Sequence, residues 1–411
     1  MARWFAILFL CGSVFGIGSG RLPSVHADTK IIPSTTLSER YDTNVFYAPP
    51  NQLPPGQRRS DFVSTIAGGV QVLHKTRDVE ASIQGGADAN AYVYNSALNY
   101  FSTSADAYAK LDGLVGRLTE GAHLLISERF RYTPEQPSFL TGTKAQTVDD
   151  PFLRGIQGFR ANTFSNTAAV NGEYPVFRGF GVQGSYAFST YRVGSILVLN
   201  STGASFFDTN VHSWSIGPSY RVSPADHLSL SYQQSLVSQT LSTGGQSFEF
   251  NTQELWANYT RINPDWTATF RVGATLIEPS SKGFPTASLT VTTNPERSTS
   301  IRLDLSRRAA PSFFVVGGAT ISNVGQLVVT HRLSKRLSIR GSVSYGYNET
   351  VPGKAVTFEN WNALAGINYS LNRTMAVDLS YNYNNFKLTQ PGLPFEVLRD
   401  VVMLSLTAHW N

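Results

Sequence analysis

The chain has 411 residues, of which 41% are hydrophobic, 12% aromatic and only 15% charged, and its formal net charge is +5 at pH 7. Soluble domains average about 25% charged residues, so this scarcity of charge argues against an ordinary soluble protein. The small net charge gives no signal for nucleic-acid binding. After residue 27 the sequence contains no run of about 18 apolar residues, which excludes membrane-spanning helices.

Residues 1–27 are typical of a secretory signal peptide that is cleaved. Arg3 supplies the positive start, residues 4–17 form an apolar core, and Val25-His26-Ala27 resembles a small-residue cleavage site. A transmembrane anchor would need a longer apolar run, of roughly 20 residues. A lipoprotein signal at Cys11 is disfavoured by the bulky Leu10 before it. Cleavage would remove Cys11, the only cysteine, and would leave 31 of the 33 basic residues beside all 28 acidic ones.

Apolar and polar residues alternate with a period of two along much of the remaining chain, which predicts β-strands. The clearest cases are residues 79–93, 266–276, 337–347, 361–371 and 375–383. In 337–347, Leu337, Ile339 and Val343 share one face, and Ser338, Arg340 and Ser342 share the other. A soluble β-sandwich or solenoid would need charged residues on its exposed face, whereas here the polar face is mostly Ser, Thr, Asn, Gln and Gly. The pattern favours a transmembrane β-barrel with lipid outside and water inside.

Short turns alternate with longer loops, as in outer-membrane barrels. The predicted short turns lie at residues 75–78, 111–116, 189–192, 223–226, 263–265, 294–298, 334–336 and 371–373. Eight such turns and nine longer loops give an all-β, antiparallel up-and-down barrel of about 18 strands, within a range of 16 to 20. The first strand is expected near residues 31–43 and the last at 399–411, so residues 28–411 form a single barrel.

One outer loop, at about residues 133–175, is much longer than the others. A loop of this length is uncommon unless it has a role. It could fold into the lumen and narrow it, or it could lie outside the membrane. A third possibility is that "FRANTFSNTAAV" within it pairs as a strand.

Aromatic residues gather at the predicted strand ends, where amphipathic rings favour the lipid headgroup level. The inner girdle is predicted to contain Tyr220, Tyr259, Trp266, Tyr369 and Trp410, and the outer girdle Tyr345, Tyr347, Tyr381 and Tyr383. In soluble sheets such residues are ordinary strand formers, which does not explain their position at strand ends. The last strand also resembles the C-terminal recognition strand of outer-membrane proteins, with Trp410 in place of a terminal Phe.

The segment Tyr41-Asp42-x-Asn44-Val45-Phe46, followed by Ser60-Asp61 and Gly68-Gly69, resembles the opening of the putative β-barrel porin 2 family. The turns in "YRVSPADHLSLSY" and "YTRINPDWTATF" are similar in style. The resemblance implies an outer-membrane barrel, and some members of this family are associated with exosortase and exopolysaccharide systems. It implies no catalytic residues.

Several charged residues are predicted to point into the lumen: Glu80, Asp88, Arg271, Arg302, Asp304, Arg340 and Asp378. Arg271, Arg302, Arg340 and Asp378 each lie five or six residues above an inner turn. The three arginines could therefore form a basic arc that favours anionic or polar solutes. Alternatively, the lumenal charges pair with one another and simply fill the lumen.

No metal site or cofactor is predicted. The six histidines after residue 27 have no metal-binding spacing, and no glycine-rich loop opens a helix.

The predicted function is passive or weakly selective diffusion of small polar solutes through the outer membrane of a Gram-negative-type bacterium. The first alternative is a non-conducting or plugged barrel that acts in exopolysaccharide export or surface assembly. An outer-membrane hydrolase is the other alternative, but no Ser–His–acid trio emerges from the strand phases. Expected partners are outer-membrane lipid, the outer-membrane assembly machinery and small polar solutes. A homo-oligomer or an export-system partner is also possible, and no nucleic acid is expected.

Overall fold

The computed structural model describes residues 28–49, 53, 56–134, 160–196, 207–241, 247–278, 282–293, 298–311, 319–351, 353, 356–389 and 395–410. The predicted signal peptide, residues 1–27, lies outside the described residues. Among the described residues, no helix is long and apolar enough to cross a bilayer.

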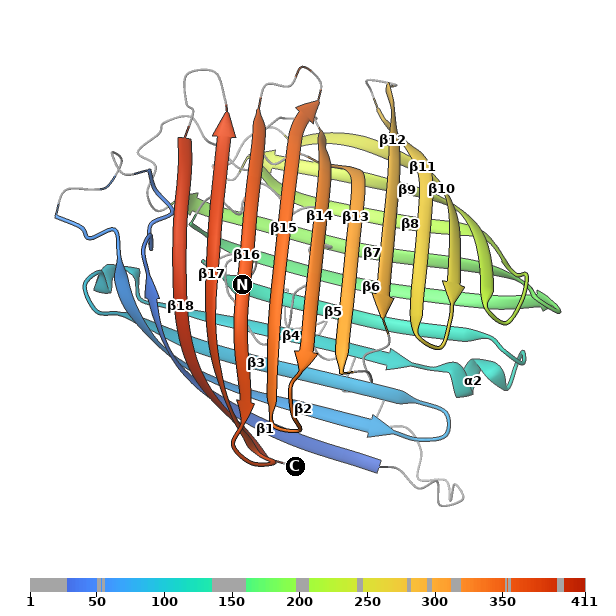
Figure 1. Cartoon of the computed structure of the whole chain (residues 1–411). Helices are drawn as coiled ribbons and strands as arrows, with labels where there is room; N and C mark the ends of the chain where they lie inside the picture. The colour runs from blue at the N-terminus through green and yellow to red at the C-terminus, as the bar shows by residue number, and fades with distance from the viewer. Residues whose placement is uncertain are drawn as a thin grey trace, which may run out of the picture.

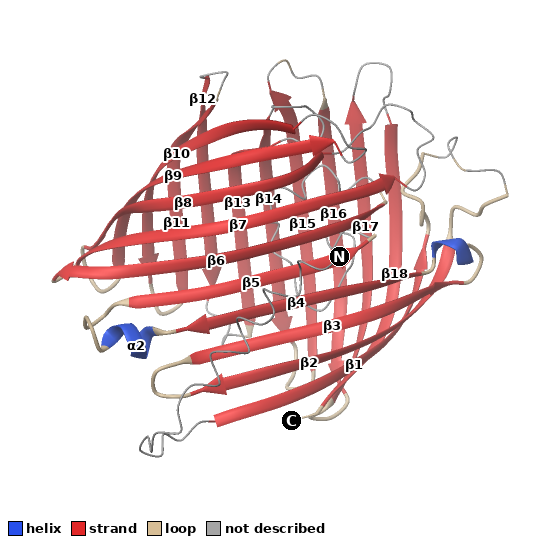
Figure 2. Ribbon diagram, turned by 180° about the vertical axis from the view of Figure 1, so that it is seen from behind, coloured by secondary structure: helices blue, strands red, loops and turns tan. Residues whose placement is uncertain are grey.

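Eighteen antiparallel strands form one closed sheet in which each strand pairs with its neighbours in sequence, and β18 returns to pair with β1 (Figures 1 and 2). In hydrocarbon an unpaired backbone edge costs several kcal/mol, and closure removes it. The strands are β1 Asp28–Asp42, β2 Asp61–Lys75, β3 Glu80–Tyr92, β4 Tyr100–Lys110, β5 His123–Thr133, β6 Ala161–Phe177, β7 Phe180–Ile196, β8 Phe207–Arg221, β9 Asp226–Leu241, β10 Ser247–Ile262, β11 Trp266–Ile277, β12 Lys282–Thr293, β13 Thr299–Pro311, β14 Ala319–Arg332, β15 Leu337–Val351, β16 Thr357–Ser370, β17 Met375–Thr389 and β18 Phe395–His409. The predicted all-β barrel of 18 strands is confirmed.

We call the end with the short connections and the C-terminus the turn end, and the opposite end the loop end. The turn end carries the one described α-helix, α2 (Asp112–Gly116), between β4 and β5. A short 3₁₀ helix, η1 (Ser96–Leu98), follows β3 at the loop end. In Figure 1 the strands β13–β18 run steeply in front, whereas β2–β7 cross behind them.

Two sequence predictions around β6 and β7 are wrong. The predicted loop 133–175 includes most of β6, so the connection after β5 ends at residue 160, and the predicted turn 189–192 lies inside β7. The actual turn is Arg178-Gly179, where Gly179 adopts φ +79°. Glycine populates this left-handed region readily, whereas "STYR" contains no residue that favours it. Of the segment "FRANTFSNTAAV", residues 161–170 pair as part of β6, and residues 135–159 of the predicted loop lie outside the described residues.

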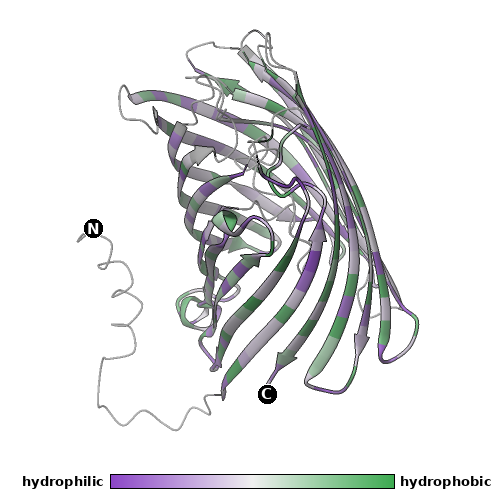
Figure 3. Cartoon of the chain, turned by 90° about the vertical axis from the view of Figure 1, so that its left-hand side faces the viewer, coloured by the Kyte–Doolittle hydropathy of each residue, from purple (hydrophilic) through white to green (hydrophobic). Residues whose placement is uncertain are grey.

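The two faces of the wall differ as the alternation predicts. Outward side chains such as Ile66, Leu379 and Leu404 are about half exposed, whereas inward neighbours such as Asp378, Ser380 and Ser405 are buried. Along single strands, hydrophobic and hydrophilic positions alternate (Figure 3). An apolar outer face and a polar inner face are the arrangement of membrane barrels.

Apolar side chains fill the loop end of the barrel interior. One cluster joins Val45, Phe46 and Ala48, which follow β1, to Val63 of β2, Tyr92 of β3 and Leu98 of η1. A second joins Val211, Val237, Phe250 and Ile277 of β8–β11 to Ala319 of β14. These two clusters add apolar packing to the loop end of a largely polar interior.

Gly273 on β11 provides a test of the packing between neighbouring strands. A Cβ at this position would lie 2.0 Å from the carbonyl oxygen of Leu255, a backbone atom that cannot move aside without disturbing β10. We expect Gly273→Ala to lower the free energy of unfolding by about 1–3 kcal/mol, measured by urea titration in lipid vesicles. Gly68→Ala is the matched control, because a Cβ there meets no atom within 4 Å. Equal stability of the two variants would contradict the close approach of β10 and β11.

Candidate functional site

The candidate site is the lumen together with its loop end. The seven charged residues predicted to line the pore all occupy inward positions of β3, β11, β13, β15 and β17, on the same face as the buried polar residues. Their role in solute passage remains a hypothesis, but their partners are defined.

Arg340 of β15 and Asp378 of β17 form an ion pair across the intervening strand β16, with Nη2 2.9 Å from Oδ1. Gly366 of β16, which faces Arg340 in register, makes this contact possible. A Cβ at Gly366 would lie 2.9 Å from Arg340 Nε, so a larger residue would obstruct the arginine. Strand alternation placed both charges inward but could not show that they meet.

Arg302 and Asp304 pair along a single strand, because residues two apart in β13 share a face. Arg302 Nε lies 2.6 Å from Asp304 Oδ2, and the Thr290 hydroxyl of β12 donates to Asp304 Oδ1 at 2.9 Å. The pair brings no net charge to this part of the lumen.

Arg271 of β11 lies in a polar cluster formed with residues of the neighbouring strand β10. Its Nε donates to Asn258 Oδ1 at 2.6 Å, and its guanidinium lies 4.7 Å above the centroid of the Trp256 ring. Trp256 Nε1 in turn donates to Glu254 at 2.7 Å. The sequence analysis did not single out Glu254, Trp256 and Asn258 of β10, although residues two apart on a strand share one face.

The two predicted acidic residues of β3 also have partners. Glu80, at the turn end, lies 3.0 Å from Lys110 Nζ and 3.7 Å from Lys75 Nζ. Asp88 accepts hydrogen bonds from Ser102 and Asn90. The predicted lumenal charges thus lie beside opposite charges or polar side chains, and their effect on solute passage stays a prediction.

Outside the strands, Asp112 of α2 accepts hydrogen bonds from His123 Nδ1 at 3.1 Å and from the Leu124 backbone N–H at 3.1 Å. Burial opposes ionisation of this carboxyl, but the hydrogen bond from His123 and that from Leu124 outweigh it and lower the pKa of Asp112 below its usual value. This pair fixes the turn between β4 and β5.

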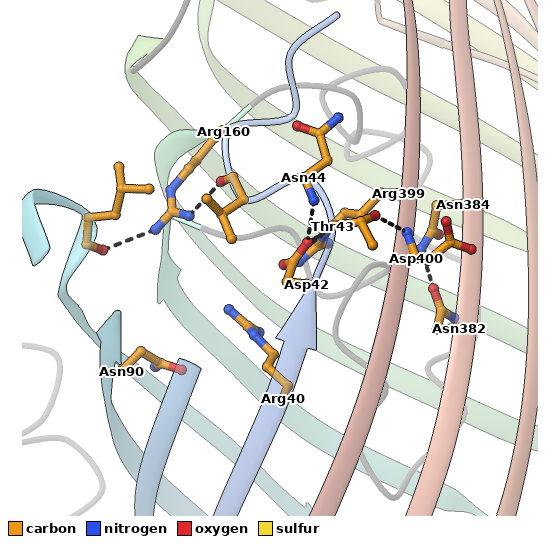
Figure 4. A network of polar contacts seen from close by, with 12 residues as sticks. Arg40, Asp42, Thr43, Asn44, Asn90, Arg160, Asn382, Asn384, Arg399 and Asp400 are labelled. Atoms are coloured by element: carbon orange, nitrogen blue, oxygen red, sulfur yellow. Dashed lines mark hydrogen bonds and ion pairs between the residues drawn. The ribbon is translucent and has the colours of Figure 1, made fainter. Parts of the chain in front are cut away.

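The loop end contains a buried ion pair that the sequence did not reveal (Figure 4). Arg399 of β18 donates to Asp42 of β1 through Nε at 3.0 Å and Nη2 at 2.5 Å, and both side chains are at most 1% exposed. Asp42 also accepts from the backbone N–H of Asn44 at 3.0 Å, and the Arg399 guanidinium lies 4.4 Å from the Tyr47 ring centroid. The pair ties the first strand to the last.

Asn44 folds the chain back into the barrel after β1. Its Nδ2 donates to the carbonyl oxygens of Ala48 and Leu398, each at 3.0 Å, and its Oδ1 accepts from the Ala48 backbone N–H. Tyr47 adopts φ +53°, in the left-handed region. Residues 44–48 are consequently buried. We call residues 43–49 the inserted segment.

Arg160, which precedes β6, holds the inserted segment from the opposite side. Its Nη1 donates to the Val45 carbonyl and to the Tyr92 hydroxyl, both at 2.8 Å, and its Nη2 donates to the Leu98 carbonyl at 3.1 Å. The side chain is 1% exposed. The connections that follow β1, β3 and β5 therefore meet at Arg160 (Figure 4).

Asp61, at the start of β2, accepts hydrogen bonds from the backbone N–H groups of Tyr94 and Asn95. Asp42, Asn44, Val45, Phe46 and Asp61, which belong to the segments that carry the family resemblance, therefore take part in these loop-end contacts. The sequence feature that could have indicated the inserted segment is the pair of short polar side chains, Asp42 and Asn44, at the end of an alternating strand. Such residues favour a tight chain reversal.

The predicted girdle residues all point outward. At the turn end Tyr220, Tyr369 and Trp410 are exposed, and Tyr259 and Trp266 are partly buried. At the loop end the Tyr381 hydroxyl donates to Asp400 at 2.6 Å. Tyr345 lies 4.5 Å, between ring centroids, from Trp361, which sequence reasoning omitted, and Tyr347 and Tyr383 lie nearby. Their contact with lipid headgroups remains a prediction.

Among the described residues, no group of three or more His, Cys, Asp or Glu side chains could hold a metal ion.

Residues 283–410, which span β12 to β18, match the family described as Putative beta-barrel porin 2. No curated protein matches the chain in sequence. Among solved structures, the chain is similar to Pseudomonas aeruginosa OccK7 (OpdD), with 12% identity, 93% of this chain and 99% of that chain covered, and a TM-score of 0.44. Acinetobacter baumannii OccAB3 has 8% identity, the same coverage and a TM-score of 0.45. Pseudomonas aeruginosa opdK has 11% identity, the same coverage and a TM-score of 0.42. By its closed 18-stranded fold and the family match over residues 283–410, the chain is a porin-like β-barrel.

Proposed function

We propose that the protein is an outer-membrane channel for passive or weakly selective diffusion of small polar solutes in a Gram-negative-type bacterium. The observation that carries the proposal is the closed 18-stranded barrel with apolar outward and polar inward faces. Barrels of 16–18 strands are wide enough to enclose an aqueous path. Export through residues 1–27 and assembly guided by β18 belong to the same proposal.

The paired lumenal charges argue for weak ion selectivity. Arg302–Asp304 and Arg340–Asp378 each sum to zero net charge, and many of the remaining inward side chains of these strands are hydroxyls and amides. Such groups hydrogen-bond neutral polar solutes without a large electrostatic barrier for either sign of ion.

The inserted segment supports a narrowed loop end. Residues 44–48 are buried inside the barrel mouth beside the apolar cluster that contains Val63 and Tyr92. We therefore expect smaller conductance than an open 18-stranded barrel would give. Planar-bilayer recordings of the purified protein test the channel directly: stable ohmic openings support it, and a silent protein contradicts it.

Replacing Arg271, Arg302 and Arg340 together by serine should shift the reversal potential in a salt gradient toward cation selectivity. The substitutions leave Asp304, Asp378 and Glu254 in the lumen without their arginine neighbours, so the lumen becomes negative. The matched control is Arg340→Ser with Asp378→Ser, which removes one pair and no net charge and should leave the reversal potential nearly unchanged. An unchanged reversal potential in the triple variant would exclude these arginines from the conduction path.

A second candidate is a non-conducting barrel that takes part in exopolysaccharide export or surface assembly. The observation that favours it is the apolar packing at the loop end, where Phe358 and Phe386 are almost fully buried and their ring centroids lie 6.2 Å apart. A silent wild-type protein that conducts once the inserted segment is released would support this candidate.

We infer no catalytic role. Described histidine contacts include those with Thr29, Tyr186, Thr299 and Asp112, and none of these four forms part of a Ser–His–acid arrangement. Lipid-hydrolysing activity of the purified protein would overturn this inference.

A further inference from the structure

A polar pair lies on the outward face of β5 and β6, where lipid would otherwise meet the wall. Asn166 Nδ2 donates to Glu128 Oε1 at 3.4 Å. Glu128 stands in register with Ala107 and Ala168. It shares its face with Ile126, which is exposed like its cross-strand partner Val170. The outward position of the pair follows from this alternation.

The pair adjoins the loop-end aromatic level of these strands, because Asn166 is in register with Phe130. Toward the turn end, Tyr174 of β6 is exposed and points outward. Toward the loop end, Phe130 and Phe164 meet with ring centroids 5.5 Å apart. A carboxylate facing lipid is destabilising, by an amount that depends on depth. An ionisable residue in this position is a candidate for contact with another protein surface.

Beside the larger Ile126, Phe130 and Val170, the wall near the pair has several small outward side chains. These are Ala87, Ala89 and Ala91 of β3, Ala105, Ala107 and Ala109 of β4, and Ala168 and Gly172 of β6. On β16–β18 the outward face carries Trp361, Ile367, Leu379 and Leu404 beside Ala363 and Ala365. Small residues allow two membrane proteins to approach closely.

We propose that the outward face of β4–β6 is a dimer interface with a second copy of this chain, with the two-fold axis beside Glu128 and Asn166. The pair consists of one acceptor and one donor, so a two-fold axis brings each Asn166 amide to the Glu128 carboxylate of the other copy. Within one chain the pair is joined by a single long hydrogen bond of 3.4 Å, so the Asn166 amide and the Glu128 carboxylate can each take a further partner. This interface does not depend on whether the barrel conducts.

Cysteine cross-linking tests the position of the interface. In a Cys11→Ser background, Ala168→Cys should give a cross-linked dimer with a short bis-maleimide in lipid vesicles. Ala365→Cys is the control, because it is outward and exposed on β16, on the opposite wall in Figure 1. Equal cross-linking at both positions, or none at Ala168→Cys, would overturn the proposal.

Replacing both residues of the polar pair tests dimer association separately from the stability of the folded monomer. The double variant Glu128→Leu/Asn166→Leu should weaken the dimer by about tenfold or more in its dissociation constant, measured by native mass spectrometry from nanodiscs. As a monomer, the double variant should resist unfolding by urea at least as well as the wild type, because leucine suits a lipid-facing position. Glu39→Leu, which removes an outward carboxylate on β1, should leave the dimer unchanged. A double variant that dimerises like the wild type, or a wild type that is monomeric, would overturn the proposal.

Discussion

Replacing Arg399 by alanine is expected to lower the free energy of unfolding by about 3–5 kcal/mol, the largest stability effect we predict for a single substitution. The substitution leaves Asp42 with an uncompensated charge in a site where it is essentially inaccessible to water. It also removes the guanidinium that lies against the Tyr47 ring, so the inserted segment loses a packing surface. Urea titration of the barrel folded in lipid vesicles measures the change.

Two comparisons separate the buried pair from a general effect of removing arginine. Arg117→Ala removes a pair with Asp78 in which the arginine is 64% exposed, and exposed pairs contribute about 0–1 kcal/mol. The double variant Asp42→Leu/Arg399→Met should be more stable than Asp42→Leu or Arg399→Met alone, since it leaves no unpaired charge. A loss for Arg399→Ala no larger than that for Arg117→Ala would contradict the ion pair.

Arg160→Ala is expected to raise the mean single-channel conductance, by about twofold or more if the inserted segment withdraws from the mouth. The arginine supplies hydrogen bonds to the carbonyl groups of Val45 and Leu98 and to the Tyr92 hydroxyl. Without these donors, buried polar atoms lose their partners, which disfavours the inserted conformation. Planar-bilayer recordings at fixed salt and voltage give the conductance.

Arg160→Lys provides a graded control, because a lysine keeps the charge but cannot reproduce the fork of guanidinium donors. Its conductance should lie between those of the wild type and Arg160→Ala. Arg117→Ala, at the turn end, should conduct like the wild type. If Arg160→Ala folds and conducts like the wild type, the inserted segment does not limit the pathway.

The number of strands and the faces of most of them could be predicted because both depend on short-range regularities. In β15, Leu337, Ile339 and Val343 alternate with Ser338 and Ser342, and this period of two assigns the inward face before any contact is known. Prediction failed at β6 and β7, where outward Ala168, Gly172 and Gly184 blur the alternation and the turn depends on Gly179.

The candidate site was only partly predictable. The inward position of Arg340 and Asp378 followed from alternation, but their pairing requires that β15, β16 and β17 align so that Gly366 lies between them. The inward position of Arg271 was predicted, but its contacts with Trp256 and Asn258 of the neighbouring strand were not. The register between neighbouring strands decides which side chains meet, and the sequence of a single strand does not specify that register.

The sequence by itself determined that the chain forms antiparallel strands with one apolar and one polar face, and that their connections alternate between short and long. Those properties reside in consecutive residues. Only the tertiary structure decided that Asp42 meets Arg399, 357 positions away, and that residues 43–49 turn into the barrel mouth. Closure of the sheet brings the first and last strands together and gives the buried Asp42 carboxylate a cationic partner that offsets its desolvation, and the contacts of Asn44 and Arg160 then hold residues 43–49 inside.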